Sequence, residues 1–323
     1  MKPSIYGEIA VFALPSMVSF GIKACEEIGI ALGKLNIKKH SDGEWKPKFK
    51  DNVRQKNVFI ICSLRTSDEW IQLLLTIDDA MRASAARITV VVTYYGYARQ
   101  EKKAEPRVPI AAALWQKLMQ AAGACHIIFL DLHSAAIQGF CDVPADHLWA
   151  SPTLMDVIHD QIDFSNLVIV SPDVGALPMV KSVCGRYHLP WAVLDKRRSK
   201  DGEISDDPIT VIGDVKGKDV LIIDDIGDTC NTVCKGEMAV KDAGAIKSYA
   251  AFTHPVLSGN ASINLSGSGF EQVWVTDSVP LNGNQQHPLI SVVSVAPLIG
   301  KAILITHLGD SISELFPEHT KPK

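Results

Sequence analysis

Two adjacent carboxylates, Asp224 and Asp225, follow a short apolar run at residues 220–223 and precede a small polar turn at 228–232. The apolar run has the length and composition of a fully buried parallel strand, and a helical pattern begins at Thr232. Amide and hydroxyl groups of such a turn, with the positive end of the helix dipole, can bind a phosphate. The two acids can bind sugar hydroxyls or a metal ion. The segment therefore predicts a site for a phosphorylated sugar. An ordinary strand and capped helix explains it less well, because a cap does not require two acids at the strand end.

A histidine and further carboxylates follow other predicted strands. Oxygen ligands of this kind suit Mg²⁺. We expect the ligands of a divalent metal ion among five residues, Asp131, His133, Asp142, Asp146 and Asp173. A lone histidine is more often a structural residue, so these residues alone leave both interpretations open.

Two clusters of cations complete the candidate chemistry. A loop at 94–109 carries two prolines and the cations Arg99, Lys102, Lys103 and Arg107. This composition alone is typical of a mobile surface loop, but such a loop can also close over a polyphosphate, to which Arg makes forked contacts. The second cluster, at 196–198, is either a solvated charge run or a set of cations that neutralises charge developing in phosphoryl transfer.

Apolar runs of strand length alternate with helical periods along nearly the whole chain. The predicted strands lie at 9–14, 58–62, 88–94, 126–131, 167–171, 191–194, 209–212, 220–223, 248–252, 272–276 and 290–293. The predicted helices lie at about 70–85, 110–122, 176–187, 232–243 and 297–307, the first with a capping box from Thr66 to Glu69. This alternation predicts α/β architecture, with two doubly wound, mostly parallel sheets.

The break near residue 150 suggests two domains, 1–150 and 151–300, and we expect a C-terminal helix within 301–323 to pack on the first domain. Ligands should gather at the carboxyl ends of the strands, near the cleft between the domains.

The bulk composition excludes several function classes. A net charge of −4 over 323 residues does not indicate a nucleic-acid-binding surface. The apolar segment at 9–20 is interrupted by Pro15 and lacks a basic leader, so we read neither a signal peptide nor a membrane span. Seven scattered cysteines without a CxxC pair are typical of a reducing compartment. We therefore expect a cytoplasmic protein without nucleic-acid or membrane partners.

Together these segments resemble the ribose-phosphate diphosphokinase (PRPP synthetase) family. The matching motifs occur in family order and at near-family spacing, from about Gly33 onward: SDGE (41–44), YARQEKK (97–103), RVPIAA (107–112), DLHSAAIQGFCDVPADHL (131–148), SPDVGA (171–176), LDKRR (194–198), IIDDIGDTCNT (222–232) and THLGDSISELF (306–316). The resemblance implies two domains of phosphoribosyltransferase type. It also implies a Mg²⁺-dependent transfer of the β,γ-diphosphoryl group of ATP to the 1-hydroxyl of ribose 5-phosphate, which yields PRPP and AMP.

The resemblance further implies roles for individual residues. Those for ribose 5-phosphate are Asp224 and Asp225 at the hydroxyls, and Asp228, Thr229, Cys230, Asn231 and Thr232 at the 5-phosphate. Those for ATP are Arg99, Gln100 and His133, with Asp42, Gly43 and Glu44 of a neighbouring subunit at the adenine end. His133 and Asp173 would serve Mg²⁺, and the catalytic cations would be Lys196, Arg198, Lys102, Lys103 and Arg107. A nucleotide site shared between subunits implies a homo-oligomer.

Two departures and two alternatives accompany the resemblance. Asn231 stands where the family has a glycine in the phosphate turn, and His40 stands where it has a phenylalanine near adenine; Asn tolerates a left-handed backbone better than most side chains. One alternative is a non-catalytic regulatory relative, which would not need to retain Lys196, Arg198 or Asp173. The other is a phosphoribosyltransferase that consumes PRPP, which usually has one such domain.

Overall fold

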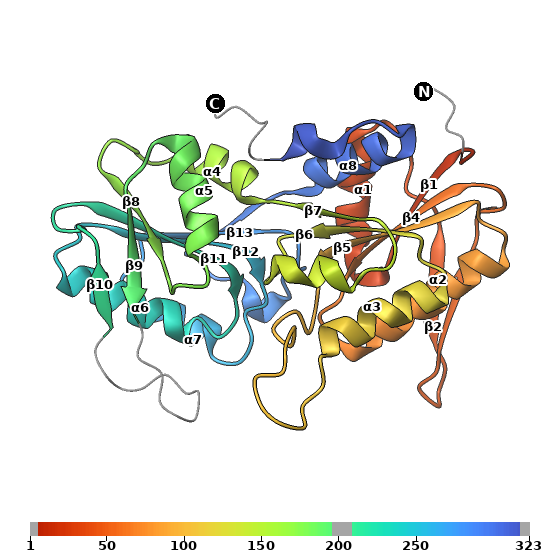
Figure 1. Ribbon diagram of the computed structural model, residues 1–323, viewed down its shortest axis with the longest axis horizontal. Coiled ribbons are helices and arrows are strands. Elements are labelled where there is room, and N and C mark those ends of the chain that lie inside the picture. Colours follow the sequence, from red (N-terminus) through yellow and green to blue (C-terminus); the bar gives the residue numbers. More distant parts are fainter. Residues whose placement is uncertain (1–5, 196–208, 317–323) are drawn as a thin grey trace. The chain divides into compact units, whose positions relative to one another are not determined.

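The computed structural model describes residues 6–195 and 209–316, which form two compact units (Figure 1). The chain leaves the first unit after Trp149 and enters the second at Ala150. It returns to the first unit at Ser278–Pro280 and again from Ser294 to Phe316. The second return begins six residues before residue 300, which the sequence analysis gave as the end of the second domain.

The first unit is built on five parallel strands whose order along the sheet follows the chain. They are β1 (Ile9–Ala13), β4 (Asn57–Ser63), β5 (Arg87–Tyr94), β6 (His126–Leu130) and β7 (Ala145–Leu148). All seven residues of β4 and all five of β6 are buried. Strands buried on both faces read as unbroken apolar runs, which is why four of the five were predictable.

Helices cover both faces of this sheet. On one face α2 (Ser67–Arg82) and α3 (Ala111–Ala122) lie side by side (Figure 1), and their apolar residues form one core with alternate strand residues such as Ile60. On the other face α1 (Val18–Glu27) packs against Ala13 and against α8 (Ala296–Leu308). The capping box predicted for α2 is confirmed, because Thr66 Oγ1 accepts the Glu69 amide at 3.3 Å and the Thr66 amide donates to the Glu69 carboxylate at 2.8 Å.

A two-stranded hairpin that the apolar pattern did not predict packs beside α2. It consists of β2 (Leu35–Lys39) and β3 (Trp45–Phe49). Phe49 contacts Phe12 edge to face, with 4.6 Å between ring centroids, and its amide donates to Asp79 of α2 at 3.3 Å. These contacts fix the base of the hairpin, and its tip at residues 40–44 is solvent-exposed.

The second unit contains a seven-stranded sheet. In sheet order the strands are β10 (Thr210–Ile212), β9 (Trp191–Asp195), β8 (Leu167–Ser171), β11 (Asp219–Gly227), β12 (Ser248–Pro255), β13 (Gln272–Thr276) and β14 (Ile290–Val293). Only β10 is antiparallel to its neighbour, β9. The chain runs outward from β8 to one edge and then returns to the other side of β8 as β11. In an open α/β sheet, ligands bind beyond the carboxyl ends of the strands at such a reversal.

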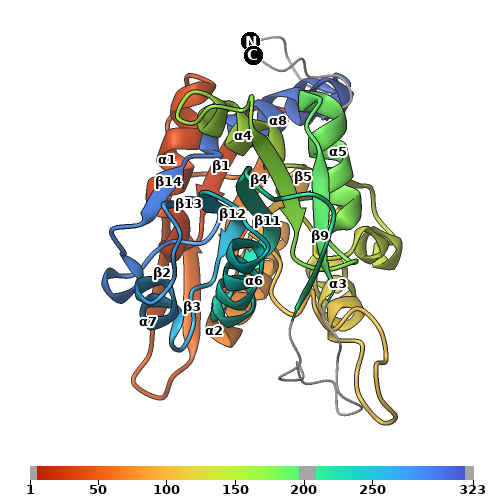
Figure 2. The ribbon, with the colours of Figure 1, turned by 90° about the vertical axis from the view of Figure 1, so that its left-hand side faces the viewer.

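Helices also cover both faces of the second sheet. Apolar residues of α6 (Asn231–Asp242) and α7 (Ala261–Ser266) form one core with β8, β11 and β12, and Figure 2 shows α6 lying against β11 and β12. The helices α4 (Ser151–His159) and α5 (Leu177–Tyr187) pack outside that core, α4 against β13 and β14 and α5 against β8 and β9. The predicted α/β class with two mostly parallel sheets is therefore confirmed.

Three predicted boundaries need correction. The strand predicted at 220–223 continues to Gly227, so Asp224 and Asp225 lie within β11 and not beyond its end. The helix predicted from Thr232 begins one residue earlier, at Asn231. The final helix, predicted at about 297–307, runs from Ala296 to Leu308 and so begins before the segment 301–323 in which it was expected to lie; Gly309 after it adopts a left-handed conformation. Among the described residues, no helix combines the length and the apolar content that a membrane span requires.

Candidate active site

A carboxylate cluster lies at the reversal of strand order in the second sheet. Asp224 and Asp225 are partly buried in β11, and the Asp225 amide donates to Asp224 Oδ1 at 3.0 Å. Burial raises the pKa of Asp224 well above its ordinary value, and the negative charges of Asp225 and Asp173 raise it further. Asp224 and Asp225 of β11 and Asp173 of the turn after β8 therefore lie close enough to influence one another electrostatically.

Asp173 is held by its own turn. Its Oδ1 accepts the amides of Gly175 at 2.8 Å and Ala176 at 3.1 Å, directly before α5 begins at Leu177. The Ser171 hydroxyl donates to the Asp173 carbonyl at 2.7 Å. The position of this carboxylate is thus set by backbone that the following helix continues.

The turn at 228–230 and the first residues of α6 present a row of amide groups. In the described part of the chain, the amides of Thr229, Cys230, Asn231 and Thr232 donate no hydrogen bond, as is usual where a helix begins. The left-handed residue of the turn is Cys230, with φ 58°, and Asn231 is the first helical residue. Asn231, which stands where the family has a glycine, therefore does not adopt the left-handed conformation of this turn.

The thiol of Cys230 does not oppose an anion at this turn. Burial, with smaller effects from Cys234 and Asp228, raises the pKa of Cys230 to about 12. At neutral pH the thiol is therefore protonated and uncharged. Unpaired amides, the helix dipole and the absence of a thiolate together favour an anion here.

Two residues that the sequence analysis did not identify, Ser258 and Asn264, donate hydrogen bonds to this turn from other segments. The Ser258 amide donates to the Asp228 carbonyl at 3.1 Å and its hydroxyl donates to the Asp228 carboxylate. The side-chain amide of Asn264 donates to the Thr229 carbonyl at 2.8 Å. A signal existed for Ser258, because it follows β12, whose carboxyl end must lie beside that of β11. None existed for Asn264, which comes from α7.

In the first unit, Asp131 and His133 occupy a tight turn after β6. Asp131 is buried, has a positive φ of 37°, and its amide donates to the Leu148 carbonyl at 2.9 Å. The Leu132 amide donates to Nε2 of His147 at 2.8 Å. His133 follows and is solvent-exposed. Contacts with β7 thus set the backbone that presents His133.

Asp142 and Asp146 lie apart from that turn. Asp146 contacts Nε2 of His126 at 2.8 Å, and His126 begins β6, so the pair lies toward the amino ends of the strands. The Asp142 amide donates to Gln120 near the end of α3 at 2.6 Å. Because Asp131 follows the carboxyl end of β6, the structure does not bring these two acids together with it.

The cationic loop is anchored at both ends and exposed between them. Tyr95 donates its hydroxyl to the Ala112 carbonyl at 2.7 Å, and a Cβ at Gly96 would lie 2.0 Å from the Leu64 carbonyl oxygen, so glycine is required there. Between the anchors Arg99, Gln100, Lys102, Lys103 and Arg107 are exposed, and Lys102 contacts Glu101 at 3.1 Å. An exposed ion pair of this kind contributes little to the stability of the fold, so Lys102 can leave Glu101 to contact a ligand.

The residues expected at the adenine end form the tip of the β2–β3 hairpin. The Glu44 amide donates to Asp42 Oδ1 at 3.0 Å, and Gly43 has φ 98°. This turn is ordered by its own bonds and leaves the tip exposed. Lys196 and Arg198 lie outside the described residues.

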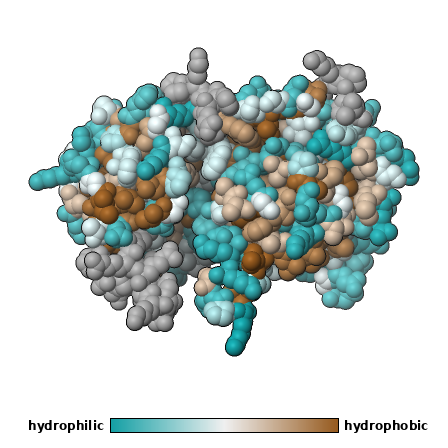
Figure 3. Space-filling view, in the orientation of Figure 1, coloured by the Kyte–Doolittle hydropathy of each residue, from teal (hydrophilic) through white to brown (hydrophobic). Residues whose placement is uncertain are grey.

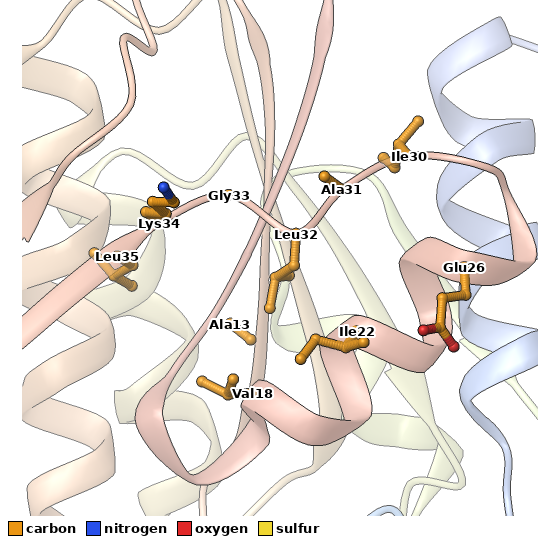
Figure 4. A pocket seen from close by; sticks show the side chains of 10 residues that line it. All are labelled: Ala13, Val18, Ile22, Glu26, Ile30, Ala31, Leu32, Gly33, Lys34 and Leu35. Atoms are coloured by element: carbon orange, nitrogen blue, oxygen red, sulfur yellow. The ribbon is translucent and has the colours of Figure 1, made fainter.

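Two surface features contain none of the predicted site residues. A pocket of about 500 Å³ beside α1 is lined mainly by apolar side chains, with Glu26 and Lys34 among the residues around it (Figure 4). Figure 3 shows apolar side chains among polar ones over α2 and α3, where Ile71, Leu75 and Leu114 are exposed. Lys34 is the single cation among the described residues that line the pocket, so this mainly apolar pocket does not suit a phosphorylated ligand.

Comparisons with known proteins agree with one another over nearly the whole chain. The family model for the N-terminal domain of ribose phosphate pyrophosphokinase matches residues 9–123, and the model for the phosphoribosyl synthetase-associated domain matches residues 199–317. The chain is 41% identical over 309 residues to a ribose-phosphate pyrophosphokinase of Agrobacterium fabrum, covering 95% of this chain and 99% of that one. It is 37% identical over 314 residues to ribose-phosphate pyrophosphokinase 1 of Streptococcus pneumoniae serotype 4, covering 96% and 98%. The crystal structure of phosphoribosylpyrophosphate synthetase from Mycobacterium smegmatis matches with a TM-score of 0.87 and 32% identity, over 93% of this chain and 98% of that one.

Proposed function

The chain belongs to the ribose-phosphate pyrophosphokinase family, and from that premise we propose how its own residues carry out the reaction. The protein is an ATP-dependent diphosphotransferase that transfers the β,γ-diphosphoryl group of ATP to the 1-hydroxyl of ribose 5-phosphate. The sugar hydroxyl oxygen attacks the β-phosphorus, the bond from that phosphorus to the α–β bridging oxygen breaks, and the hydroxyl proton is released. The products are PRPP and AMP.

The amides at the start of α6 bind the 5-phosphate of the acceptor. The observation that carries this assignment is the row of four unpaired N–H groups, Thr229–Thr232, directly after two acids of β11. A phosphate accepts hydrogen bonds from such groups without needing a lysine or arginine. Asp224 and Asp225 then accept hydrogen bonds from the ribose hydroxyls, and Asp228 keeps the turn in place through Ser258. The sugar is thereby oriented from both ends.

The donor set of the second unit fits Mg²⁺. Burial, followed by the negative charges of Asp225 and Asp173, raises the pKa of Asp224, and a divalent cation bound beside these acids would relieve the repulsion between them. No three histidine, cysteine or acidic side chains of the described residues form a ready-made metal cage. This suits Mg²⁺, which is usually held by one or two carboxylates together with substrate phosphates. When bound, the ion neutralises phosphate charge. In the second unit, Asp173 with the β11 acids would hold such an ion. We separately assign His133 of the first unit to Mg²⁺, and Asp131 supports the turn that carries His133.

Cations of the two loops neutralise the charge of the transferring group. Arg99 and Gln100 bind the ATP phosphates, and Lys102, Lys103 and Arg107 are exposed on a loop that can close over them. Lys196 and Arg198 contact the transition state. Phosphoryl transfer depends on in-line positioning and charge neutralisation more than on covalent catalysis. These side chains therefore act by placing positive charge beside the transferring group, without forming a bond to it.

The exposed hairpin tip, with Asp42, Gly43 and Glu44, serves the nucleotide site of a neighbouring subunit, and the protein is accordingly a homo-oligomer. Sedimentation velocity tests this point: we expect at least a dimer. Hairpin-tip substitutions should raise the KM for ATP without changing the KM for ribose 5-phosphate. A monomer with full activity would contradict a shared site.

A product assay tests the proposed function. Purified protein with ribose 5-phosphate, MgATP and inorganic phosphate should form AMP and PRPP in equal amounts. The matched control replaces ribose 5-phosphate with ribose, which lacks the phosphate, and should give no AMP. Formation of ADP in place of AMP would show transfer of a single phosphoryl group. No AMP with any nucleoside triphosphate would favour the regulatory alternative.

A further inference from the structure

We propose that the side chain of Asn264 is a positioning residue for the acceptor's anion site, because it sets the direction of the Cys230 amide in the phosphate turn. The inference rests on the proposed function and adds to it a residue that touches neither substrate. Asn264 lies in α7, outside every motif that the sequence analysis identified.

The argument begins with the geometry of the peptide bond. In a trans peptide the carbonyl of one residue and the N–H of the next lie in one plane and point in opposite directions. A hydrogen bond that fixes a carbonyl therefore also fixes the direction of the following N–H. For the amides of 229–231 to face one anion, the carbonyls of 228–230 must be held on the opposite side.

Each of these three carbonyls is held. The Asp228 carbonyl accepts the Ser258 amide at 3.1 Å, and the Cys230 carbonyl accepts the Cys234 amide at 3.0 Å. Both of those donors are backbone groups. The Thr229 carbonyl accepts the Asn264 side chain at 2.8 Å. The Asp228 carbonyl has a second, long contact of 4.0 Å from the Cys230 thiol. Among the described contacts, the peptide that carries the Cys230 N–H is therefore the one in this row whose carbonyl is held by a side chain without a backbone donor.

This peptide is also the one under strain. Cys230 has φ 58° and ψ 1°, the left-handed conformation that costs a residue with a Cβ free energy. Rotation of the Thr229–Cys230 peptide plane would relieve that strain and would turn the Cys230 N–H away from the row. The bond from Asn264 opposes the rotation.

Asn264 is itself well anchored for this role. Its neighbour Leu265 is 1% exposed in the core of the second unit, and the Cys234 thiol donates to the Asn264 carbonyl at 3.5 Å. Cys234 belongs to α6, the helix whose start forms the anion site. The donor and the turn that it restrains are thus tied to the same helix.

Removal of the side-chain donor should lower the population of the binding-competent turn. The apparent dissociation constant rises by the inverse of that population. Loss of one neutral hydrogen bond corresponds to a change of about 3- to 10-fold. We expect Asn264→Ala to raise the KM for ribose 5-phosphate by about that factor. The KM for MgATP and kcat at saturating ribose 5-phosphate should stay within about twofold of the wild-type values.

The experiment compares three variants by steady-state AMP formation and by thermal unfolding. Asn264→Leu keeps a side chain of similar shape without a donor, so it should behave as Asn264→Ala does. Asn260→Ala is the matched control, because Asn260 stands at the start of the same helix and its side chain makes no capping bond. Its kinetic constants should equal those of the wild type.

The outcomes separate the inference from the function. If wild-type protein forms AMP and both Asn264 variants keep the wild-type KM for ribose 5-phosphate, the positioning role is refuted. Recovery of that KM by Asn264→Leu alone would show that packing, and not donation, matters. Equal rises in both substrate KM values with a lowered Tm would show a general structural defect and also refute it. If the wild type forms no AMP, the proposed function itself fails.

Discussion

Replacement of Asp224 by asparagine should make the ligand-free protein more stable at neutral pH and much less active. Burial, the charge of Asp225 and the charge of Asp173 all disfavour ionisation of Asp224 and raise its pKa well above the ordinary value of 3.8. Asparagine has the same shape and its Oδ1 can still accept the Asp225 amide, which donates to Asp224 at 3.0 Å. The substitution therefore removes the charge and preserves the hydrogen bond.

The sign of the pH dependence follows from linkage. As pH rises above the ordinary pKa of 3.8, the unfolded chain loses the Asp224 proton before the folded chain does, so the folded wild type binds more protons and loses stability relative to the variant. The difference in free energy of unfolding between Asp224→Asn and the wild type should be small near pH 3.8. It should grow until the pH passes the raised pKa of Asp224 in the folded protein, and then remain constant. Every tenfold decrease in the acid dissociation constant of Asp224 on folding corresponds to about 1.4 kcal/mol, or roughly 3–6 °C in Tm for a domain of about 150–250 residues.

The loss of activity has a separate cause. A hydrogen bond between a carboxylate and a sugar hydroxyl contributes about 1.5–3 kcal/mol, so kcat/KM for ribose 5-phosphate should fall by about 10- to 150-fold.

Urea unfolding between pH 4 and pH 8, with kinetics at neutral pH, measures both effects. Asp219→Asn, at the opposite end of β11, serves as the control and should change neither. If Asp224→Asn unfolds at lower urea concentration than the wild type at pH 7, or if its advantage shrinks as pH rises, the account of crowded charge is wrong.

Three further predictions test other parts of the site. Gly227→Ala places a Cβ 2.7 Å from the Phe252 ring, so the free energy of unfolding should fall by about 1–3 kcal/mol and the KM for ribose 5-phosphate should rise; unchanged urea unfolding would contradict the packing argument. Lys196→Ala should lower kcat at least about a hundredfold with folding intact; a rate near that of the wild type would remove Lys196 from the mechanism. Removal of divalent ions with EDTA should abolish AMP formation, and added Mg²⁺ should restore it; full activity in EDTA would exclude the metal requirement.

Buried strands and their order of appearance were readable from the sequence because they are unbroken apolar runs. The strands β8, β13 and β14 have the predicted bounds, and the other strands that were predicted differ by a few residues at their ends. Elements of mixed polarity were missed: the hairpin β2–β3, α1, α4, α7 and β7. Their burial depends on partners distant in the chain, as for α1, which packs against α8.

The candidate site divides in the same way. The acids Asp173, Asp224 and Asp225 were found because each follows or ends an apolar run, and parallel strands bring such ends together. Asp146 was expected among the metal ligands after β6, but it lies in β7 and contacts His126 at the start of β6. The apolar pattern did not predict β7, so the sequence did not indicate this position. Side-chain preference makes Asn231 tolerant of a left-handed backbone, but that conformation falls on Cys230, in a turn held by contacts from Ser258 and Asn264.

A crystal structure of the protein with ribose 5-phosphate would test the central claim most directly. The account predicts that the 5-phosphate accepts hydrogen bonds from the amides of Thr229–Thr232 and that the sugar hydroxyls contact Asp224 and Asp225. A phosphate bound elsewhere, or a turn closed by the Asn231 side chain with the sugar excluded, would contradict it.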